Sequence, residues 1–223
     1  NVGRILDAID CLGLQDNTVV IYVSDHGETF SSRDGIPNKY VCHDDSVRIP
    51  LLIRHPSSTP PGWVSDKPVG VQDLLPTILT YAGLPIPERT QGRALQELLE
   101  EKGETWRDAY YIENEMTPHC RWLDASHVIV LPAIKQRALR TAQWKLILSE
   151  HGLHTLYNLE NDPEEVLDLY GAPYKDIYDQ YQHFGPMDDV IYELAAKLKN
   201  EARTLNDEFG VTLAQQVLDN PVS

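Results

Sequence analysis

The sequence predicts an α/β domain followed by a small antiparallel sheet with a terminal helix, and three features indicate this fold class. A run of β-branched and aromatic residues over 18–24 ends in Asp25, His26 and Gly27, as a buried parallel strand does at the carboxyl edge of an α/β sheet. A second apolar run at 49–53 precedes a helical pattern. Beyond about residue 105 the pattern changes to short strands, turns and an amphipathic helix.

The first hundred residues alternate between helix and strand signals. An N-terminal helix is predicted up to Gly13, where glycine favours termination. Residues 27–46 are polar and contain glycine and proline, so we expect a loop between the two strands. Helices are expected at 71–81, with Pro76 near the first turn, and at 94–101. The helical spacing of the first segment is carried by Ile5, Leu6, Ile9 and Leu12.

The C-terminal half predicts a separate subdomain. Its last strong signal is a helix at 188–205, with apolar residues such as Ile191 and Leu198 on one face. The pattern therefore predicts two domains, 1–104 and 105–223. The short strands of the second are expected at 109–112, 128–131, 136–141, 145–148 and 155–159.

Composition excludes several classes of protein. The 223 residues contain 34 acidic and 19 basic side chains, a formal net charge of −15, which argues against nucleic acid as a partner. A hydrophobic content of 42% suffices for a core and argues against general disorder. Three cysteines form no disulfide framework, and no apolar run approaches the roughly 20 residues that span a bilayer. Cellular compartment and oligomeric state stay open.

The pair Asp25-His26 is the first candidate site. A carboxylate and an imidazole, followed by a glycine that lets the backbone turn, suit a divalent cation. The alternative is an ordinary strand end, in which the aspartate caps a turn and the histidine is exposed. Two residues alone do not decide between these interpretations.

The following residues carry a resemblance. Lys39 is followed by His43 and Asp44, four and five positions later, and by the run Ser46-Val47-Arg48-Ile49-Pro50. In this order and spacing, after Asp25-His26-Gly27, the chain resembles the sulfatases of the alkaline-phosphatase-like superfamily. Further matches are Gln72–Leu79, Ala82–Pro85, Gln91–Leu95, Arg140-Thr141, Trp144–Ile147, Leu156–Leu159, Asp162-Pro163 and Glu165.

The resemblance implies that part of an enzyme is present. Such sulfatases begin with a strand bearing paired acidic metal ligands and a Cys/Ser-x-Pro-x-Arg motif, whose first residue becomes the formylglycine nucleophile. Neither feature occurs in this sequence. The expected fold is therefore the C-terminal part of an alkaline-phosphatase-like three-layer sandwich, 1–104, with the small antiparallel subdomain, 105–223.

The resemblance also assigns roles. It implies that Asp25 and His26 are metal ligands and that Lys39 binds the sulfate oxygens. His43 is a candidate catalytic acid, whereas we interpret Asp44 and Arg48 as structural residues that pair with each other. Calcium is the expected ion, with magnesium and manganese as alternatives, because histidine stands where many sulfatases have asparagine. Further residues that we expect near the substrate are Glu28, Arg33, Asn38, His119, Arg121 and Trp122.

Three functions remain possible at this point. The first is a sulfatase acting on a small-molecule or carbohydrate sulfate ester. The second is a phosphonate monoester or phosphodiester hydrolase of the same superfamily, because such enzymes share the Asp-His pair. The third is a non-catalytic remnant. We expect the polypeptide of residues 1–223 to be inactive alone, because the nucleophile and half of the metal ligands are missing. We also expect it to be only marginally folded, because its α/β part would lack most of its sheet.

Overall fold

The computed structural model describes residues 1–30, 32, 39–56, 61–100, 105–116, 119–122, 128–131, 134–170 and 187–220. By their internal contacts the residues form two compact units: a first unit of Asn1–Gly27 and Arg48–Trp106, and a second unit of Glu28–Val47 and Arg107–Ser223. The loop Glu28–Val47 thus groups with the C-terminal residues, although the predicted boundary after residue 104 placed it with the N-terminal ones. The division into domains 1–104 and 105–223 stays a prediction.

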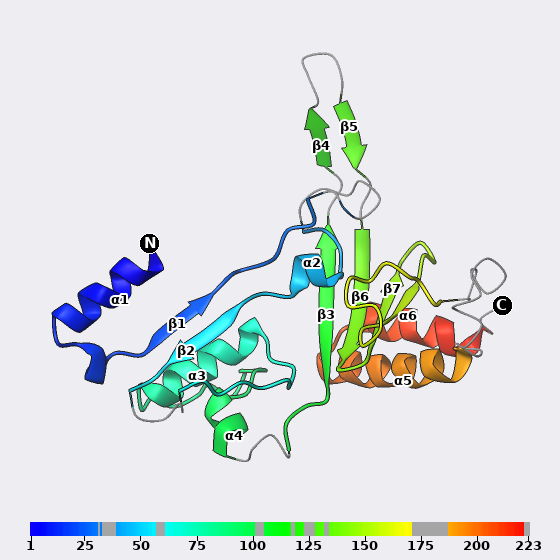
Figure 1. The fold of residues 1–223 in the computed structure, drawn as a ribbon. Helices are drawn as coiled ribbons and strands as arrows, with labels where there is room; N and C mark the ends of the chain where they lie inside the picture. The colour runs from blue at the N-terminus through cyan, green and yellow to red at the C-terminus, as the bar shows by residue number, and fades with distance from the viewer. Residues whose placement is uncertain are drawn as a thin grey trace. The chain divides into compact units, whose positions relative to one another are not determined.

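The first unit contains a two-stranded sheet and short helices. Strands β1 (Val20–Val23) and β2 (Leu51–Arg54) pair antiparallel (Figure 1). Tyr22 and Val23 are exposed. For the described residues, the expectation of a buried parallel strand at 18–24 is therefore wrong, because the chain returns in the opposite direction and both strands lack a further neighbour. The helices of this unit are α1 (Val2–Cys11), η1 (Gln15–Asn17), η2 (Val71–Asp73), α3 (Leu74–Tyr81) and α4 (Leu95–Glu100).

A buried aspartate organises the turn between α3 and α4. Both oxygens of the Asp73 carboxylate accept backbone N–H groups, from Gly70 at 2.9 Å and Arg93 at 2.8 Å. A side chain on Gly92 would collide with the carbonyl of Gln72, so only glycine allows this approach. The Gln72-Asp73 and Gly92-Arg93 motifs are thus in direct contact and have a structural role. The small core beside it consists of Leu95, Leu98 and Trp106 with Leu51, Ile53 and Val69.

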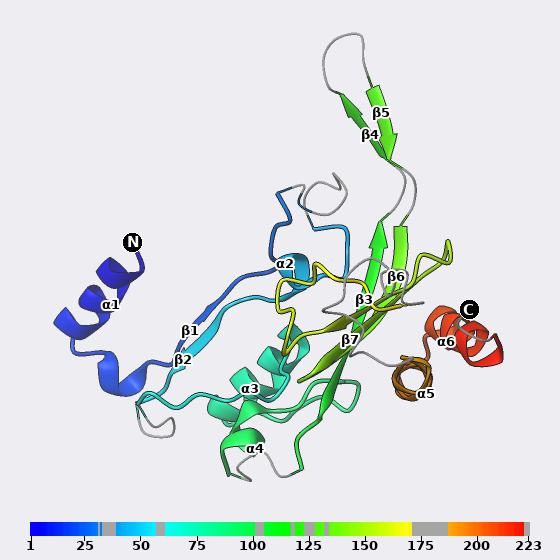
Figure 2. The same cartoon turned by 45° about the vertical axis from the view of Figure 1, so that its right-hand side comes forward.

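The second unit is built on a four-stranded antiparallel sheet in the order β3-β6-β7-β8. Helices α5 and α6 lie side by side against it (Figures 1 and 2). The strands are β3 (Ala109–Met116), β6 (Ile134–Thr141), β7 (Trp144–Ser149) and β8 (Thr155–Asn158). The hairpin strands are β4 (His119–Trp122) and β5 (Val128–Leu131), and the helices are α2 (Asp44–Val47), α5 (Asp188–Thr204) and α6 (Glu208–Asp219).

Both faces of this sheet are covered. Leu146 and Leu148 of β7 point toward α5 and α6, whereas Ile147 between them points to the opposite face, where Cys42 packs. A strand buried on both faces has a continuous apolar run, as Leu146-Ile147-Leu148 does. The predicted strands and the helix at 188–205 are confirmed, while β4 and α6 were not predicted. None of the described helices combines the length and apolar character that a membrane crossing needs.

Candidate functional site

Asp25 and His26 lie directly after β1 in the first unit. The turn is fixed locally: Ser24 Oγ donates to the His26 carbonyl at 2.8 Å, and the His26 N–H donates to Asp25 Oδ1 at 3.1 Å. The His26 Nδ1 atom is 2.7 Å from the Gly27 carbonyl oxygen. Because a carbonyl only accepts hydrogen bonds, the Nδ1 atom donates in this contact.

The other ring nitrogen of His26 faces a carboxylate. His26 Nε2 is 3.3 Å from Asp25 Oδ2, and the aspartate side chain is 84% exposed. Two ligands bound to one divalent ion at about 2.0–2.4 Å come about this close. Among the described residues, no group of three or more His, Cys, Asp or Glu side chains is arranged for a metal, so ligation of a divalent cation by Asp25 and His26 stays a prediction.

Lys39 and His43 belong to the second unit. Lys39 is exposed in a turn. His43 is half-buried just before α2, with its Nε2 atom 3.1 Å from the hydroxyl of Tyr157 on β8. The structure thus joins Asp25 to His26 and places Lys39 and His43 on one segment, and the roles of all four stay predictions. Glu28 accepts the N–H of Phe30, while Arg33 and Asn38 lie outside the described residues, as do the side chains of His119, Arg121 and Trp122.

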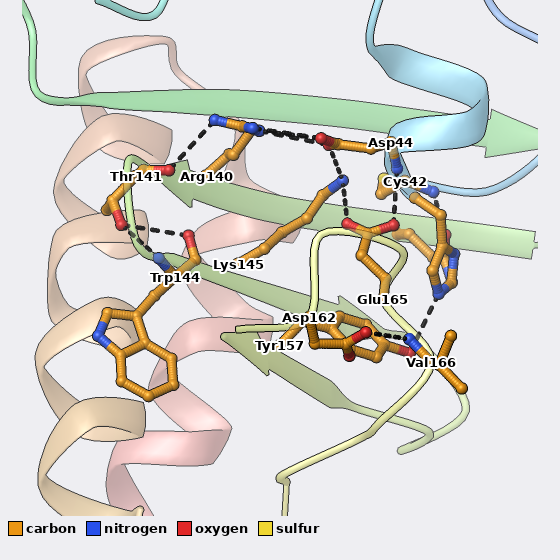
Figure 3. Close-up of polar contacts among 12 residues, drawn as sticks. Cys42, Asp44, Arg140, Thr141, Trp144, Lys145, Tyr157, Asp162, Glu165 and Val166 are labelled. Carbon is orange, nitrogen blue, oxygen red and sulfur yellow. Dashed lines mark hydrogen bonds and ion pairs between the residues drawn. The ribbon is translucent and has the colours of Figure 1, made fainter. Parts of the chain in front are cut away.

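A buried ionic cluster forms around Asp44, and its cations are Lys145 and Arg140 and not the predicted Arg48 (Figure 3). The Lys145 ammonium on β7 is 2.7 Å from Asp44 Oδ1 and 2.7 Å from Glu165 Oε1. Arg140 on β6 pairs with Asp44 at 3.2 Å. Lys145 is fully buried. Lysine is rarely buried without a partner. The lysine within the apolar run Trp144–Ser149 was therefore the one sequence signal that could have indicated a buried ion pair.

The two carboxyl groups of this cluster respond differently to it. Burial disfavours ionisation of Asp44, but the charge of Lys145 and the hydrogen bonds from Arg140 and Lys145 outweigh it, so the pKa of Asp44 is lowered. For Glu165, burial dominates over the attraction to Lys145 and raises the pKa. Asp44 is therefore the firmly ionised partner of Lys145.

A family comparison decides what the chain is. Residues 34–184 match the family described as N-sulphoglucosamine sulphohydrolase, C-terminal. The chain belongs to this sulfatase family. An arylsulfatase of Clostridium perfringens is 33% identical over 178 residues, which are 77% of this chain and 33% of that protein. The chain spans about a third of the length of the curated relatives it matches.

Solved structures share the fold of this sulfatase-family chain. One, in complex with its substrate D-glucosamine-2-N,6-O-disulfate, is 26% identical with a TM-score of 0.66 and covers 93% of this chain and 38% of its own. A phosphonate monoester hydrolase from Silicibacter pomeroyi is also 26% identical, with a TM-score of 0.62, over 78% of this chain and 35% of its own. The resemblance to the superfamily and the fold class predicted from sequence are both confirmed.

Proposed function

We propose that the whole protein is a metal-dependent sulfatase that hydrolyses sulfate esters. In this proposal, residues 1–223 supply two metal ligands, Asp25 and His26, and a sulfate-binding lysine, Lys39. The observation that carries it is the His26 Nε2 atom held 3.3 Å from Asp25 Oδ2 in a chain of the sulfatase family. Paired acidic ligands and the formylglycine nucleophile would come from outside residues 1–223.

Each residue has a distinct task in this proposal. Asp25 and His26 would bind the ion through Oδ2 and Nε2, which lie 3.3 Å apart, and the contact of Nδ1 with the Gly27 carbonyl would orient the ring. A divalent cation bound there would act as a Lewis acid on a sulfate oxygen. Lys39 places a compact positive charge where the leaving oxygen gains negative charge. His43 is the candidate to supply a proton to that oxygen.

The proposed substrate class is a sulfated carbohydrate. The support is the structural relative bound to a disulfated glucosamine, to which 93% of this chain corresponds. With a net charge of −15, residues 1–223 repel anions at long range, so recognition of a sulfate group requires local cations. Lys39 and the metal ion are the proposed cations.

Activity measurements on the whole protein test this proposal. We expect turnover of 4-nitrophenyl sulfate or of a sulfated glucosamine, loss of turnover after dialysis against a chelator, and recovery with calcium, magnesium or manganese. Lys39→Ala should lower kcat/KM by about a hundredfold or more. Lys67→Ala is the matched control, because Lys67 is also exposed and lies in the first unit. Equal activity of the two variants would contradict the role of Lys39.

A second candidate function is hydrolysis of phosphonate monoesters or phosphodiesters. The observation that favours it is the similarity to a phosphonate monoester hydrolase at 26% identity. Comparing kcat/KM for phenyl phosphonate monoesters with that for sulfate esters separates the two. Turnover of neither class would favour a non-catalytic protein. Turnover of a sulfate ester by purified residues 1–223 would overturn the proposal that the nucleophile lies outside them.

A further inference from the structure

The segment that carries Lys39 and His43 is fastened to the C-terminal sheet, within the second unit. The amide group of Asn114 on β3 donates to the Tyr40 carbonyl at 2.8 Å. The Cys42 N–H donates to the side chain of Gln136 on β6 at 2.9 Å. Residues 39–47 are called the anchored segment below. Contacts with two strands therefore help to set the position of its backbone.

The strongest of these attachments is ionic. The Asp44 N–H donates to Glu165 Oε2 at 2.7 Å, while Glu165 Oε1 and Asp44 Oδ1 each lie 2.7 Å from Lys145 Nζ. One ammonium group thus closes a ring that contains the backbone and the side chain of Asp44 (Figure 3). Glu165 has a φ of +54°, a left-handed conformation that a non-glycine residue holds only when its surroundings fix it.

Lys145 cannot act on a substrate directly, because its side chain is fully buried. Removing its charge would take from Glu165 the cation that it contacts and would leave Asp44 paired with Arg140 alone among the cations of the cluster. Such a loss of compensation is costly in a buried site. Since Lys145 lies on β7, which pairs with β6 and β8, the loss should shift the anchored segment and not the strand.

We propose that Lys145 is a positioning residue for the reaction, which fixes the anchored segment on the sheet through Asp44 and Glu165 and so sets the places of Lys39 and His43. This inference rests on the proposed function of Lys39. A displacement of about 1 Å in a reacting group is enough to cost about a hundredfold in rate. Lys145 therefore contributes to kcat without contacting the substrate.

Two variants of the whole protein test this inference. Lys145→Met removes the ammonium group and keeps an unbranched, apolar side chain of similar length. Arg137→Met is the matched control, because Arg137 is likewise a buried cation of the same sheet, but it pairs with Asp207 and Glu115 and not with the anchored segment. At a temperature where both variants are fully folded, Lys145→Met should lower kcat by about a hundredfold with little change in KM, and Arg137→Met should leave kcat unchanged. Equal losses of kcat would overturn the inference.

A charge-balanced double variant separates positioning from stability. Lys145→Met with Glu165→Gln removes one positive and one negative charge, so the melting temperature should recover while kcat stays low. Recovery of kcat together with stability would mean that charge balance alone matters, and would overturn the inference.

Hydrogen exchange gives a readout that is independent of the reaction. In Lys145→Met, the amides of Cys42 and Asp44 should exchange at least tenfold faster than in Arg137→Met, whereas protection at these amides equal to the wild type would overturn the inference. If the wild-type whole protein hydrolyses neither sulfate nor phosphonate esters, the proposed function fails, and exchange still decides whether Lys145 fixes the segment.

Discussion

In the second unit, α5 and α6 cover one face of the four-stranded sheet and the anchored segment covers part of the other, whereas the first unit leaves many of its large apolar side chains exposed. Of the large hydrophobic side chains that are exposed among the described residues, all but Phe30, Leu153 and Val166 belong to the first unit. Helix α1 buries none of its residues.

This difference in the exposure of apolar side chains shows which unit forms a hydrophobic core from its own residues. Leu52, Leu75 and Ile78 are apolar residues with the spacing of core positions. In the folded chain, however, about half or more of each residue's surface is exposed. Surfaces of this kind are ordinarily covered by further protein. The first unit, which carries the candidate metal ligands, therefore depends on contacts that its own residues do not supply, whereas the second unit does not.

The largest expected effect is a contrast in hydrogen exchange within purified residues 1–223. Amides of β7 should exchange only through global unfolding of the second unit, and those of α1 through nearly free local opening. For a stability of about 5 kcal/mol or more, this corresponds to a difference of about a thousandfold or more in protection. Equal protection in α1 and β7 would contradict the claim that the first unit depends on further contacts and the second unit does not. Protection of α1 in the whole protein would sharpen it, since other parts of the protein would then cover the first unit.

A smaller effect is expected from paired arginine variants. Arg137 in the second unit is 3% exposed and contacts Asp207 and Glu115, so Arg137→Met should reduce the free energy of unfolding by about 3–5 kcal/mol. Arg54 in the first unit is 40% exposed and pairs with Asp10 at 3.5 Å, so Arg54→Met should cost about 0–1 kcal/mol. Urea unfolding followed by circular dichroism measures both. Similar losses would show that burial does not distinguish the two pairs.

The accuracy of the sequence predictions also differs between the two units. Strands β6, β7 and β8 were predicted within about two residues, because apolar runs and turns are local signals. The burial of β1 was predicted wrongly, since burial depends on the neighbours that a strand has and not on its own residues. Helix α6 could have been recognised from Asp207, whose side chain accepts the Gly210 N–H as an N-cap.

The candidate site was predictable only where its partners are close in sequence. Asp25 and His26 are adjacent, so their joint placement followed from the strand end. The cluster around Asp44 could not be predicted in this way, because Arg140 and Glu165 lie 96 and 121 residues further along the chain. A single sequence contains no signal for such pairs beyond the unusual lysine in β7. The structure adds this long-range information, and the proposed role of Lys145 comes from it alone.

The smallest expected effect is a change in the pH dependence of stability, which tests whether His154 in the second unit is shielded from water. His154 Nδ1 accepts the Ser149 N–H at 3.1 Å, and burial lowers the pKa of His154. The unfolded chain takes up this proton near pH 6.5, whereas the folded chain takes it up only at lower pH, so His154 reduces stability as the pH falls below about 6.5.

His154→Asn keeps an acceptor for the Ser149 N–H and removes the titration. Between pH 7.5 and 5.5, the wild type should therefore lose stability relative to this variant in urea titrations. His151→Asn is the control, because His151 is 60% exposed and close in sequence. Parallel pH curves for the wild type and His154→Asn would mean that water reaches His154, and that the second unit is less tightly closed at this turn than its buried sheet implies.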